Sequence, residues 1–380
     1  MQREVIVFQK PDYDVLRRET KFTWSARSAA SALWTLAGVP IREFNLKGVA
    51  CIEAYRKGRP LVREMFGPDV KLPALSTPAV SYGHVNGLGS ELIFPDEGEV
   101  AHTHICSSLD EGIQALRRPV DFAAAGMAPF FLEFRRQLQR AFPDEPVGFS
   151  YGLEGPITTA YELRGDGFFL DVCDRPDLSA EFLKLVTDSI LEFHRFVCGV
   201  LDKPAVSPTG SGMCDDVSSM IPPRMWRRLV LPFWEQFYGG RTTGRRSAHV
   251  EDLRPGQLGF LEEIGLSHYD PSISHKLNPR IISEKCRVPF AWRLGGFHYR
   301  TMSCGDVEDF VFQAVADGAS SVFTVVESAM CDDETAEKVR AFIRAAKEAC
   351  SLLAAGASRQ DLAQRVSDEG KRRFWSHWPE

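Results

Sequence analysis

The sequence lacks several patterns that would place a protein in a familiar class. Its 380 residues contain no CxxC pair, no GxGxxG or GxxxxGK(S/T) element, no internal repeat and no low-complexity segment. No run of about 20 apolar residues occurs, so we expect no membrane span. The first residues lack the apolar core of a signal peptide, and the nine cysteines show no regular spacing. We therefore expect a cytoplasmic protein with reduced thiols and no disulfide framework.

Basic charge is not in excess either. The formal net charge is -6, whereas nucleic-acid binders usually carry a basic face, so we expect no nucleic-acid partner. Hydrophobic residues make up 44% of the chain, which is enough to bury a full core. A chain of this length is within reach of one large α/β barrel with extensions.

Short apolar strands alternate with amphipathic helices along most of the chain. After a helical segment at 14–66 and an irregular region at 68–110, the pattern predicts helices at 130–142, 177–200, 226–238, 258–264, 306–316 and 334–353, and strands at 147–151, 205–207, 247–250, 267–270, 289–294 and 321–326. Such alternation favours parallel βαβ units, and the missing nucleotide-binding loops favour a (β/α)8 TIM barrel. We assign residues 71–380 to the barrel and residues 1–70 to an N-terminal helical extension, which would cover a barrel end or build a homodimer.

Polar side chains follow these strands at the end where barrel enzymes place their active sites. His249 and Glu251 lie two residues apart at a strand end, so their side chains point to the same side. With Glu327 or Cys331 after a later strand, they would form a zinc site that keeps one position open. The alternative is that His249 has a structural role and Glu251 pairs with a neighbouring arginine such as Arg254.

Other residues near strand ends are candidates for catalysis and substrate binding. The acids Asp216, Glu251 and Asp270 are the candidate catalytic residues. The candidate substrate-binding residues are Met213, Asp215, Tyr269, Trp292 and His298. The aromatic members would face a planar ligand, although most such residues belong to the core. Asp215 and Asp216 would orient a substrate or a base, or else cap a helix, and Glu154 is expected to be a helix cap.

Several segments are similar, in order and spacing, to one protein family. They are Tyr82–Pro95, Gly155–Gly165, Asp215–Asp216 with Ser219–Pro223 and Leu231–Trp234, His249–Glu251, and Gly318–Ala319 leading to Cys331. From about residue 60 onward the chain resembles the uroporphyrinogen decarboxylase superfamily, in its corrinoid-dependent methyltransferase branch. This resemblance implies a TIM barrel and the transfer of a methyl group to cob(I)alamin held by a separate corrinoid protein.

Departures from the family pattern narrow this implication. The Arg-Gln-Ala-Gly-Arg-Tyr segment of the decarboxylase is absent, which argues against porphyrinogen decarboxylation. An Asp-x-His-x-x-Gly corrinoid signature is also absent, so the corrinoid should belong to a partner. Relatives that act on coenzyme M bind zinc through His-x-Cys, whereas Glu251 occupies the cysteine position here and makes the site harder and less suited to a thiol.

The expected activity is therefore the transfer of a methyl group from a small methylated donor, such as a methoxylated aromatic, to a corrinoid protein. A metal or an acid would neutralise the leaving group. Two enzymatic alternatives stay open: transfer from a methyl-corrinoid to tetrahydrofolate or a thiol, and a decarboxylase-type lyase of the same superfamily. A non-catalytic protein that docks a corrinoid protein is a further alternative, against which the acids and His249 argue.

Overall fold

The computed structural model describes residues 8–376, in which short parallel strands alternate with helices. The strands are β1 (Thr23–Ser28), β2 (Val70–Lys71), β3 (Leu92–Ile93), β4 (Ala101–His102), β5 (Gly210–Cys214), β6 (Arg245–His249), β7 (His268–Asp270), β8 (Ala291–Leu294) and β9 (Ser321–Val326). One parallel sheet has the order β2-β1-β9-β8, a second has the order β5-β6-β7, and β3 and β4 form a separate antiparallel pair. These parallel sheets confirm a mixed α/β fold.

Isolated parallel bridges extend the pairing beyond the two sheets. Tyr269 bridges to Phe290 and so connects β7 with the start of β8. Ser76 and Val80, which follow β2, bridge to Gly148 and Tyr151. The parallel pairs therefore run from β5 through β7, β8, β9, β1 and β2 to the segment around residues 148–151.

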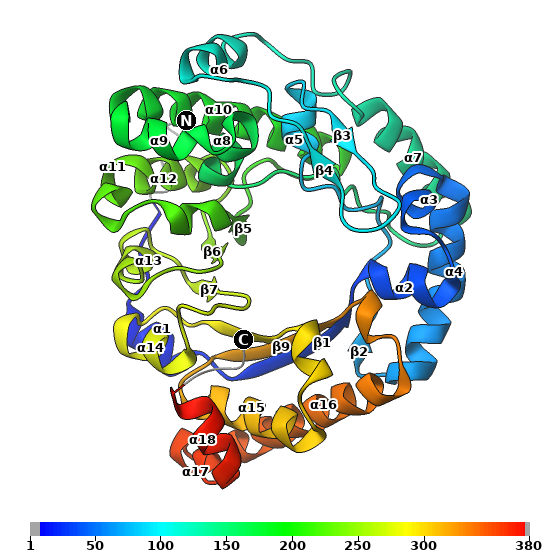
Figure 1. The fold of residues 1–380 in the computed structure, drawn as a ribbon, viewed down its shortest axis with the longest axis vertical. Coiled ribbons are helices and arrows are strands. Elements are labelled where there is room, and N and C mark those ends of the chain that lie inside the picture. Colours follow the sequence, from blue (N-terminus) through cyan, green and yellow to red (C-terminus); the bar gives the residue numbers. More distant parts are fainter. Residues whose placement is uncertain (1–7, 377–380) are drawn as a thin grey trace, which may run out of the picture.

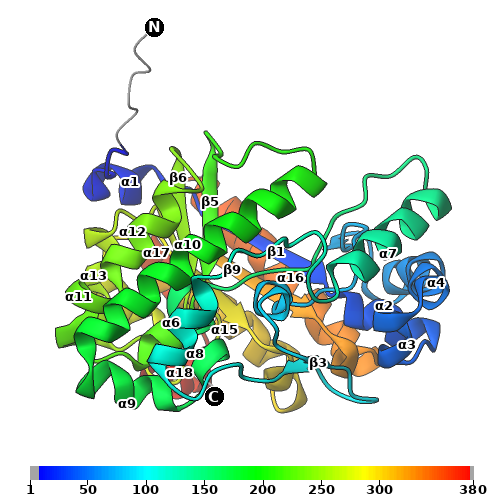
Figure 2. The ribbon, with the colours of Figure 1, turned by 90° about the horizontal axis from the view of Figure 1, so that it is seen from above.

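The helices surround these strands (Figure 1). The helices of the first half are α1 (Tyr13–Glu19), α2 (Ala30–Ala37), α3 (Ile41–Leu46), α4 (Gly48–Phe66), α5 (Gly83–Gly87), α6 (Leu109–Leu116), α7 (Ala128–Ala141), α8 (Pro156–Arg164), α9 (Gly167–Asp174) and α10 (Pro176–Val200). The others are α11 (Trp226–Leu229), α12 (Leu231–Gly239), α13 (Gly259–Glu263), α14 (Pro279–Lys285), α15 (Cys304–Ala316), α16 (Asp333–Ala354), α17 (Arg359–Ala363) and α18 (Asp368–Ser376). Figure 2 shows α8 to α13 on one side of the molecule and α2, α3, α4 and α7 on the other.

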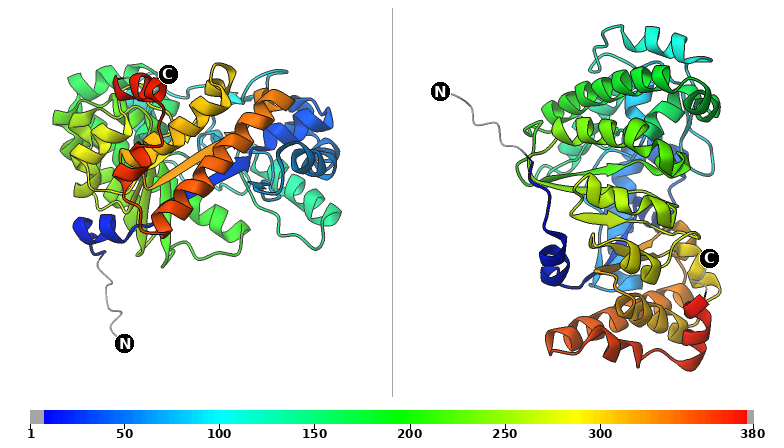
Figure 3. Two further views of the ribbon diagram at one scale, coloured as in Figure 1. Left: turned by 90° about the horizontal axis from the view of Figure 1, so that it is seen from below. Right: turned by 90° about the vertical axis from the view of Figure 1, so that its left-hand side faces the viewer.

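The long helices cover the outer faces of the strands with apolar side chains. Along α10, Phe182, Val186, Ile190 and Phe193 recur on one face and are fully buried, as the helical spacing of apolar residues predicts. Figure 3 shows α16 crossing the outer face of β1 and β9. Side chains alternate along a strand, so those next to the residues that pack on the helices point to the opposite face of the sheet.

Most predicted elements are confirmed. The helices at 177–200 and 334–353 appear as α10 and α16 with ends shifted by at most one residue, and the strand at 321–326 appears as β9. All nine cysteines are free thiols, as expected. Among residues 8–376, no helix combines the length and the apolar character needed to cross a membrane.

Two strands lie in segments that were predicted to have another structure. The segment 14–66, predicted to be helical, contains β1, which pairs with both β2 and β9 at the centre of the larger sheet. The segment after residue 207, predicted to be a loop, contains β5, while residues 147–151 and 205–207 contribute only isolated bridges. The division of the chain at residue 70 stays a prediction, but β1 lies before it and pairs with strands after it. Residues 1–7 and 377–380 of the two predicted parts lie outside the described residues.

Candidate functional site

Three neighbouring strands bring polar side chains together at their ends. In the parallel register Cys214 lies opposite His249, and His249 lies opposite Asp270. Residues in register on neighbouring strands point to the same face. Asp216 and Glu251 lie two residues after the ends of β5 and β6, so the sequence places three carboxylates around one imidazole.

His249 is the centre of this group, and 28% of its side chain is exposed. Its Nδ1 lies 3.0 Å from Oδ2 of Asp270, within hydrogen-bonding distance. Its Nε2 lies 3.7 Å from Oε1 of Glu251 and 3.8 Å from Oδ1 of Asp216. The latter distances are too long for hydrogen bonds, so Nε2 faces two carboxylates without a direct bond to either.

The carboxylates decide the charge of this histidine. Burial alone would lower the pKa of His249, but the hydrogen bond to Asp270 and the interactions with Glu251 and Asp216 outweigh burial and raise the pKa to about 10. The imidazole is therefore protonated at neutral pH, and both ring nitrogens carry a proton that can be donated.

Backbone groups hold the surrounding acids in place. The Ser272 N–H donates to Oδ1 of Asp270 at 2.8 Å, and the Glu251 N–H donates to Oδ1 of Asp216 at 2.9 Å. Burial opposes the charge of Asp270, but the hydrogen bond to His249 outweighs it and lowers the pKa of Asp270. The attraction of the nearby His249 cation also lowers the pKa of Glu251, whereas burial raises the pKa of Asp216. The candidate catalytic acids therefore lie together but differ in acidity.

Asp215, a candidate for substrate binding, lies behind this group. Its side chain is fully buried, and it accepts hydrogen bonds from the Thr158 N–H at 2.7 Å and the Trp234 Nε1–H at 2.6 Å. Burial raises its pKa to about 7. Gly155 approaches closely, since a Cβ there would lie 2.5 Å from Cβ of Asp215. Asp215 therefore connects β5, α8 and α12, and no ligand reaches it in this conformation.

Glu154, which we expected to be a helix cap, instead belongs to the electrostatic environment of the site. Glu154 precedes α8, but Gly155 occupies the capping position next to the helix. Burial is the largest cause of the raised pKa of Glu154, which is about 7. The carboxylates of Asp216 and Asp215 contribute to this raised pKa. The sequence signal for this role of Glu154 was its place in the short stretch of chain between residue 151 and the start of α8.

The predicted metal ligands are only partly brought together. Glu327 pairs with Arg293 through Oε1 and Nη2 at 2.5 Å, and Nη1 of the same arginine lies 3.4 Å from Oγ of Ser272. The Cys331 thiol is directed at the carbonyl of Glu327 at 3.6 Å, and burial raises its pKa to about 11. Within the described range 8–376, no three His, Cys, Asp or Glu side chains are arranged to bind one metal ion. His249, Glu251, Glu327 and Cys331 thus do not form a zinc-binding set in this conformation.

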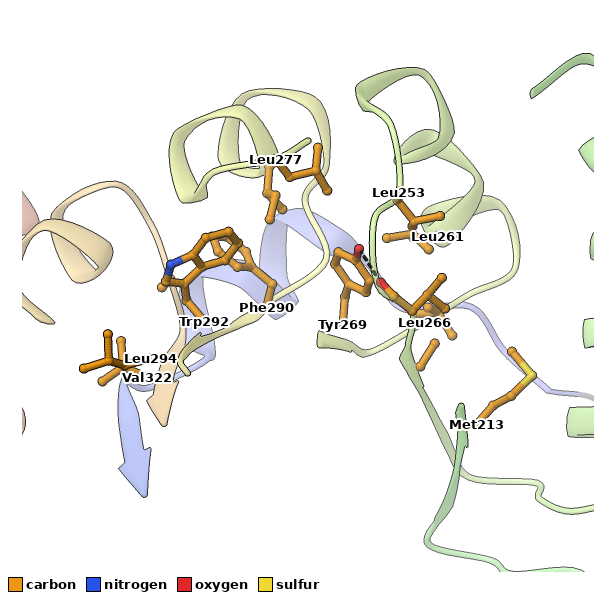
Figure 4. Close-up of a cluster of buried hydrophobic side chains, with 14 of the residues drawn as sticks. Met213, Leu253, Leu261, Leu266, Tyr269, Leu277, Phe290, Trp292, Leu294 and Val322 are labelled. Atoms are coloured by element: carbon orange, nitrogen blue, oxygen red, sulfur yellow. Dashed lines mark hydrogen bonds between the residues drawn. The ribbon is translucent and has the colours of Figure 1, made fainter. Parts of the chain in front are cut away.

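The predicted aromatic lining faces the other way. Tyr269, Trp292 and His298 are buried, and Tyr269 donates to the carbonyl of Val250 at 2.9 Å. Figure 4 shows Tyr269 and Trp292 within a cluster of apolar side chains. Side chains alternate along a strand, so when Asp270 faces inward its neighbour Tyr269 must face the helices. These three residues are buried in this structure, and their role in substrate binding stays a prediction.

A cavity of about 470 Å³ adjoins His249 and Asp270. Met213, although buried, contributes to its wall as expected. Its other walls come from residues that the strand-end pattern missed: Phe149, Phe193 and Val197, the glycine of β5 at position 212, and Arg241, Phe237 and His268. Because side chains alternate along a strand, the position of Asp270 would have indicated that His268 also lines the cavity. Arg241 follows a helix, so no such pattern indicates its position. A second cavity, of about 920 Å³, lies near the ends of β1 and β9 and includes Glu327.

Comparison of the sequence with known protein families and with curated proteins finds no match. Solved structures do match. The chain is similar in fold to a methyltransferase from Methanosarcina mazei. The TM-score is 0.62 at 16% sequence identity, over 88% of this chain and 97% of that chain. The carboxyl transferase domain of Rhizobium etli pyruvate carboxylase has a TM-score of only 0.23 at 11% identity, over 93% of this chain and 50% of that one, which is too low to support an argument. The comparison with the first structure shows a shared fold.

Proposed function

We propose that the chain is a (β/α)8-barrel methyltransferase of the uroporphyrinogen decarboxylase superfamily. It would move a methyl group from a small methylated donor to the cob(I)alamin of a separate corrinoid protein. The fold shared with the Methanosarcina mazei methyltransferase supports methyl transfer in general. The parallel pairing supports the barrel, because β1, β2, the segment at residues 148–151 and β5 to β9 supply eight parallel strands in cyclic order.

The geometry of His249 at the wall of the cavity is the observation that carries this proposal. Its Nδ1 is held by Asp270, while its Nε2 has no direct hydrogen bond to Glu251 or Asp216. A leaving oxygen or nitrogen placed at Nε2 would receive the proton as the bond to the methyl carbon breaks. The methyl group goes to the acceptor, the electron pair stays on the leaving atom, and solvent returns the proton to the imidazole. Asp270 is then a positioning residue that keeps the ring oriented and charged.

Zinc does not enter this mechanism, because the predicted ligands are not gathered as a metal-binding set. The zinc site stays a prediction, and elemental analysis of the purified wild-type protein beside a His249→Ala variant tests it. Equal metal content in the two proteins would contradict a site that depends on His249.

The methyl transfer itself is tested with reduced free cob(I)alamin as acceptor under anaerobic conditions. Methyl ethers of aromatic compounds and methylated amines serve as donors, and loss of the cob(I)alamin absorbance is followed. We expect turnover with at least one donor class and a fall of about 10²-fold in His249→Gln, the size typical for loss of an acid catalyst. The matched control is His275→Gln, since His275 also pairs with an aspartate, Asp252, but is 59% exposed and lies outside the cavity. Absence of turnover with every donor, or equal rates for His249→Gln and wild type, would refute the proposal.

A further inference from the structure

An arginine without a carboxylate partner lies in the wall of the 470 Å³ cavity beside His249. Among residues 8–376, no acid pairs with Arg241, and its Nε is buried without a hydrogen-bond partner. Its guanidinium stacks on Phe237, with 4.4 Å between Cζ and the ring centroid. Burial lowers the pKa of Arg241 to about 10, so the group is still a cation at neutral pH. The Arg241 side chain is half-buried, and a partner of opposite charge would offset its partial desolvation.

Arg246, five residues further along, shows how this fold treats a structural arginine. Its side chain is buried and its Nε likewise has no hydrogen-bond partner, but its Nη atoms form two hydrogen bonds with Glu235, at 2.6 and 2.7 Å. A third hydrogen bond reaches the carbonyl of Ile264 at 3.0 Å. The cost of burying this charge is thus offset within the protein. Arg241 has no equivalent of Glu235, and it faces a cavity, so the missing anion fits a ligand.

The remaining walls of the cavity suit a small molecule with an apolar body. Phe149, Phe193 and Val197 line it together with Gly212, whose missing side chain leaves room beside β5. A volume of about 470 Å³ falls in the range of small-molecule sites. Aromatic and aliphatic walls with a few polar groups are typical of such sites.

Charge fixes the direction in which an anionic ligand would lie. Asp270 lines the cavity, and Asp216 and Glu251 lie within 4 Å of His249, so this end repels a second negative charge. Arg241 is the cation that attracts it. A ligand with a carboxylate at one end would therefore place its other end at His249.

We propose that this cavity binds a methyl donor that carries a carboxylate. The carboxylate pairs with Arg241 in the two-pronged geometry that guanidinium favours, and the apolar body lies against Phe149 and Phe193. The methylated oxygen or nitrogen then lies at His249. The reacting end of this ligand rests on the proposed methyl transfer, whereas the anion site at Arg241 does not.

Equilibrium binding tests the anion site without any corrinoid. The probes are 4-methoxybenzoate and its neutral amide, 4-methoxybenzamide, measured by isothermal titration calorimetry. We expect the wild-type protein to bind the acid about ten-fold or more tightly than the amide, as for a hydrogen bond to a charged group. Arg241→Gln should lose this preference, and Arg241→Lys should keep part of it. The control is Arg227→Gln, an exposed arginine that already pairs with Glu263 and should leave the preference unchanged.

Thermal unfolding separates a binding role from a structural one. Removing an unpaired, half-buried charge should leave the Tm of Arg241→Gln equal to or above that of the wild type, whereas loss of a structural arginine would lower it. Equal affinity for acid and amide, binding of neither probe, or an unchanged preference in Arg241→Gln would overturn the proposal. Arg241-dependent binding without methyl transfer would sustain the anion site and refute only the proposed activity.

Discussion

Replacing Asp270 by asparagine tests the charge of His249 directly. The two side chains are 3.0 Å apart, and both are largely shielded from water, with 28% and 22% of their side-chain surfaces exposed. Asparagine keeps an acceptor for Nδ1 but removes the negative charge. A single opposite charge at this range shifts a pKa by about 1 to 3. We therefore expect the pKa of His249 to fall from about 10 to about 8, which corresponds to about 3 kcal/mol.

The pKa is measured by NMR, from the pH dependence of the imidazole C–H resonance that disappears in His249→Gln. The control is Glu327→Gln, since Glu327 also follows a strand but pairs with Arg293 and does not act on His249. It should leave the His249 titration unchanged. If methyl transfer is observed, the rate should decline above about pH 8 in Asp270→Asn and near pH 10 in the wild type. A wild-type His249 that titrates near 6.5, or a titration unaffected by Asp270→Asn, would refute the reasoning.

Three other perturbations have defined outcomes. Because the folded-state pKa of His249 is raised from 6.5 to about 10, its contribution to stability is full below pH 6.5 and is lost as the pH rises toward 10. Urea unfolding should show this as a decline of at most about 5 kcal/mol, absent in His249→Gln. Asp215→Ala removes the acceptor of the buried Trp234 Nε1–H and should lower the free energy of unfolding by about 2 kcal/mol; an unchanged urea midpoint would contradict its positioning role. Gly212→Leu should fill the cavity wall, since a Cβ there meets only Oγ of Ser247, at 3.3 Å. Calorimetry should then show weaker probe binding at an unchanged Tm, and full affinity would contradict the placement of the ligand.

Elements with strong local patterns could be predicted from the sequence, and strands without them could not. The apolar spacing of α10 and the β-branched run of β9 are properties of the segments themselves. β1 has the sequence TWSARS, with one β-branched residue, and β5 has GSGMC, with none, so neither carries the run of β-branched residues that typically indicates a strand. β1 is a strand because it pairs with β9, almost 300 residues away, in a register from Thr23↔Ser321 to Ser28↔Val326. Such pairing is a tertiary property that no local window contains.

The residues of the site also fall into those that could be predicted from the sequence and those that could not. His249, Glu251 and Asp270 could be grouped from the sequence because each ends a strand or follows it by two residues. The direction of the Tyr269 side chain could not be predicted from its position near a strand end, because neighbouring residues on a strand point to opposite faces of the sheet. If Asp270 is taken to face the site, alternation along β7 correctly places the Tyr269 side chain on the opposite face.

Arg241 shows why the proposed anion-binding end of the cavity could not be predicted from the sequence. It follows α12 within a basic run, where an arginine ordinarily lies in solvent, but here it lines a cavity to which α10 and β5 also contribute. Phe193 and Val197 of α10 line the same cavity, so the apolar wall and the cation depend on segments that are far apart in the sequence. His249 is a cation surrounded by acids, and Arg241 is a cation without any. A ligand that satisfies both must be acidic at one end and able to accept a proton at the other, and a methyl ether or amine bearing a carboxylate has this combination.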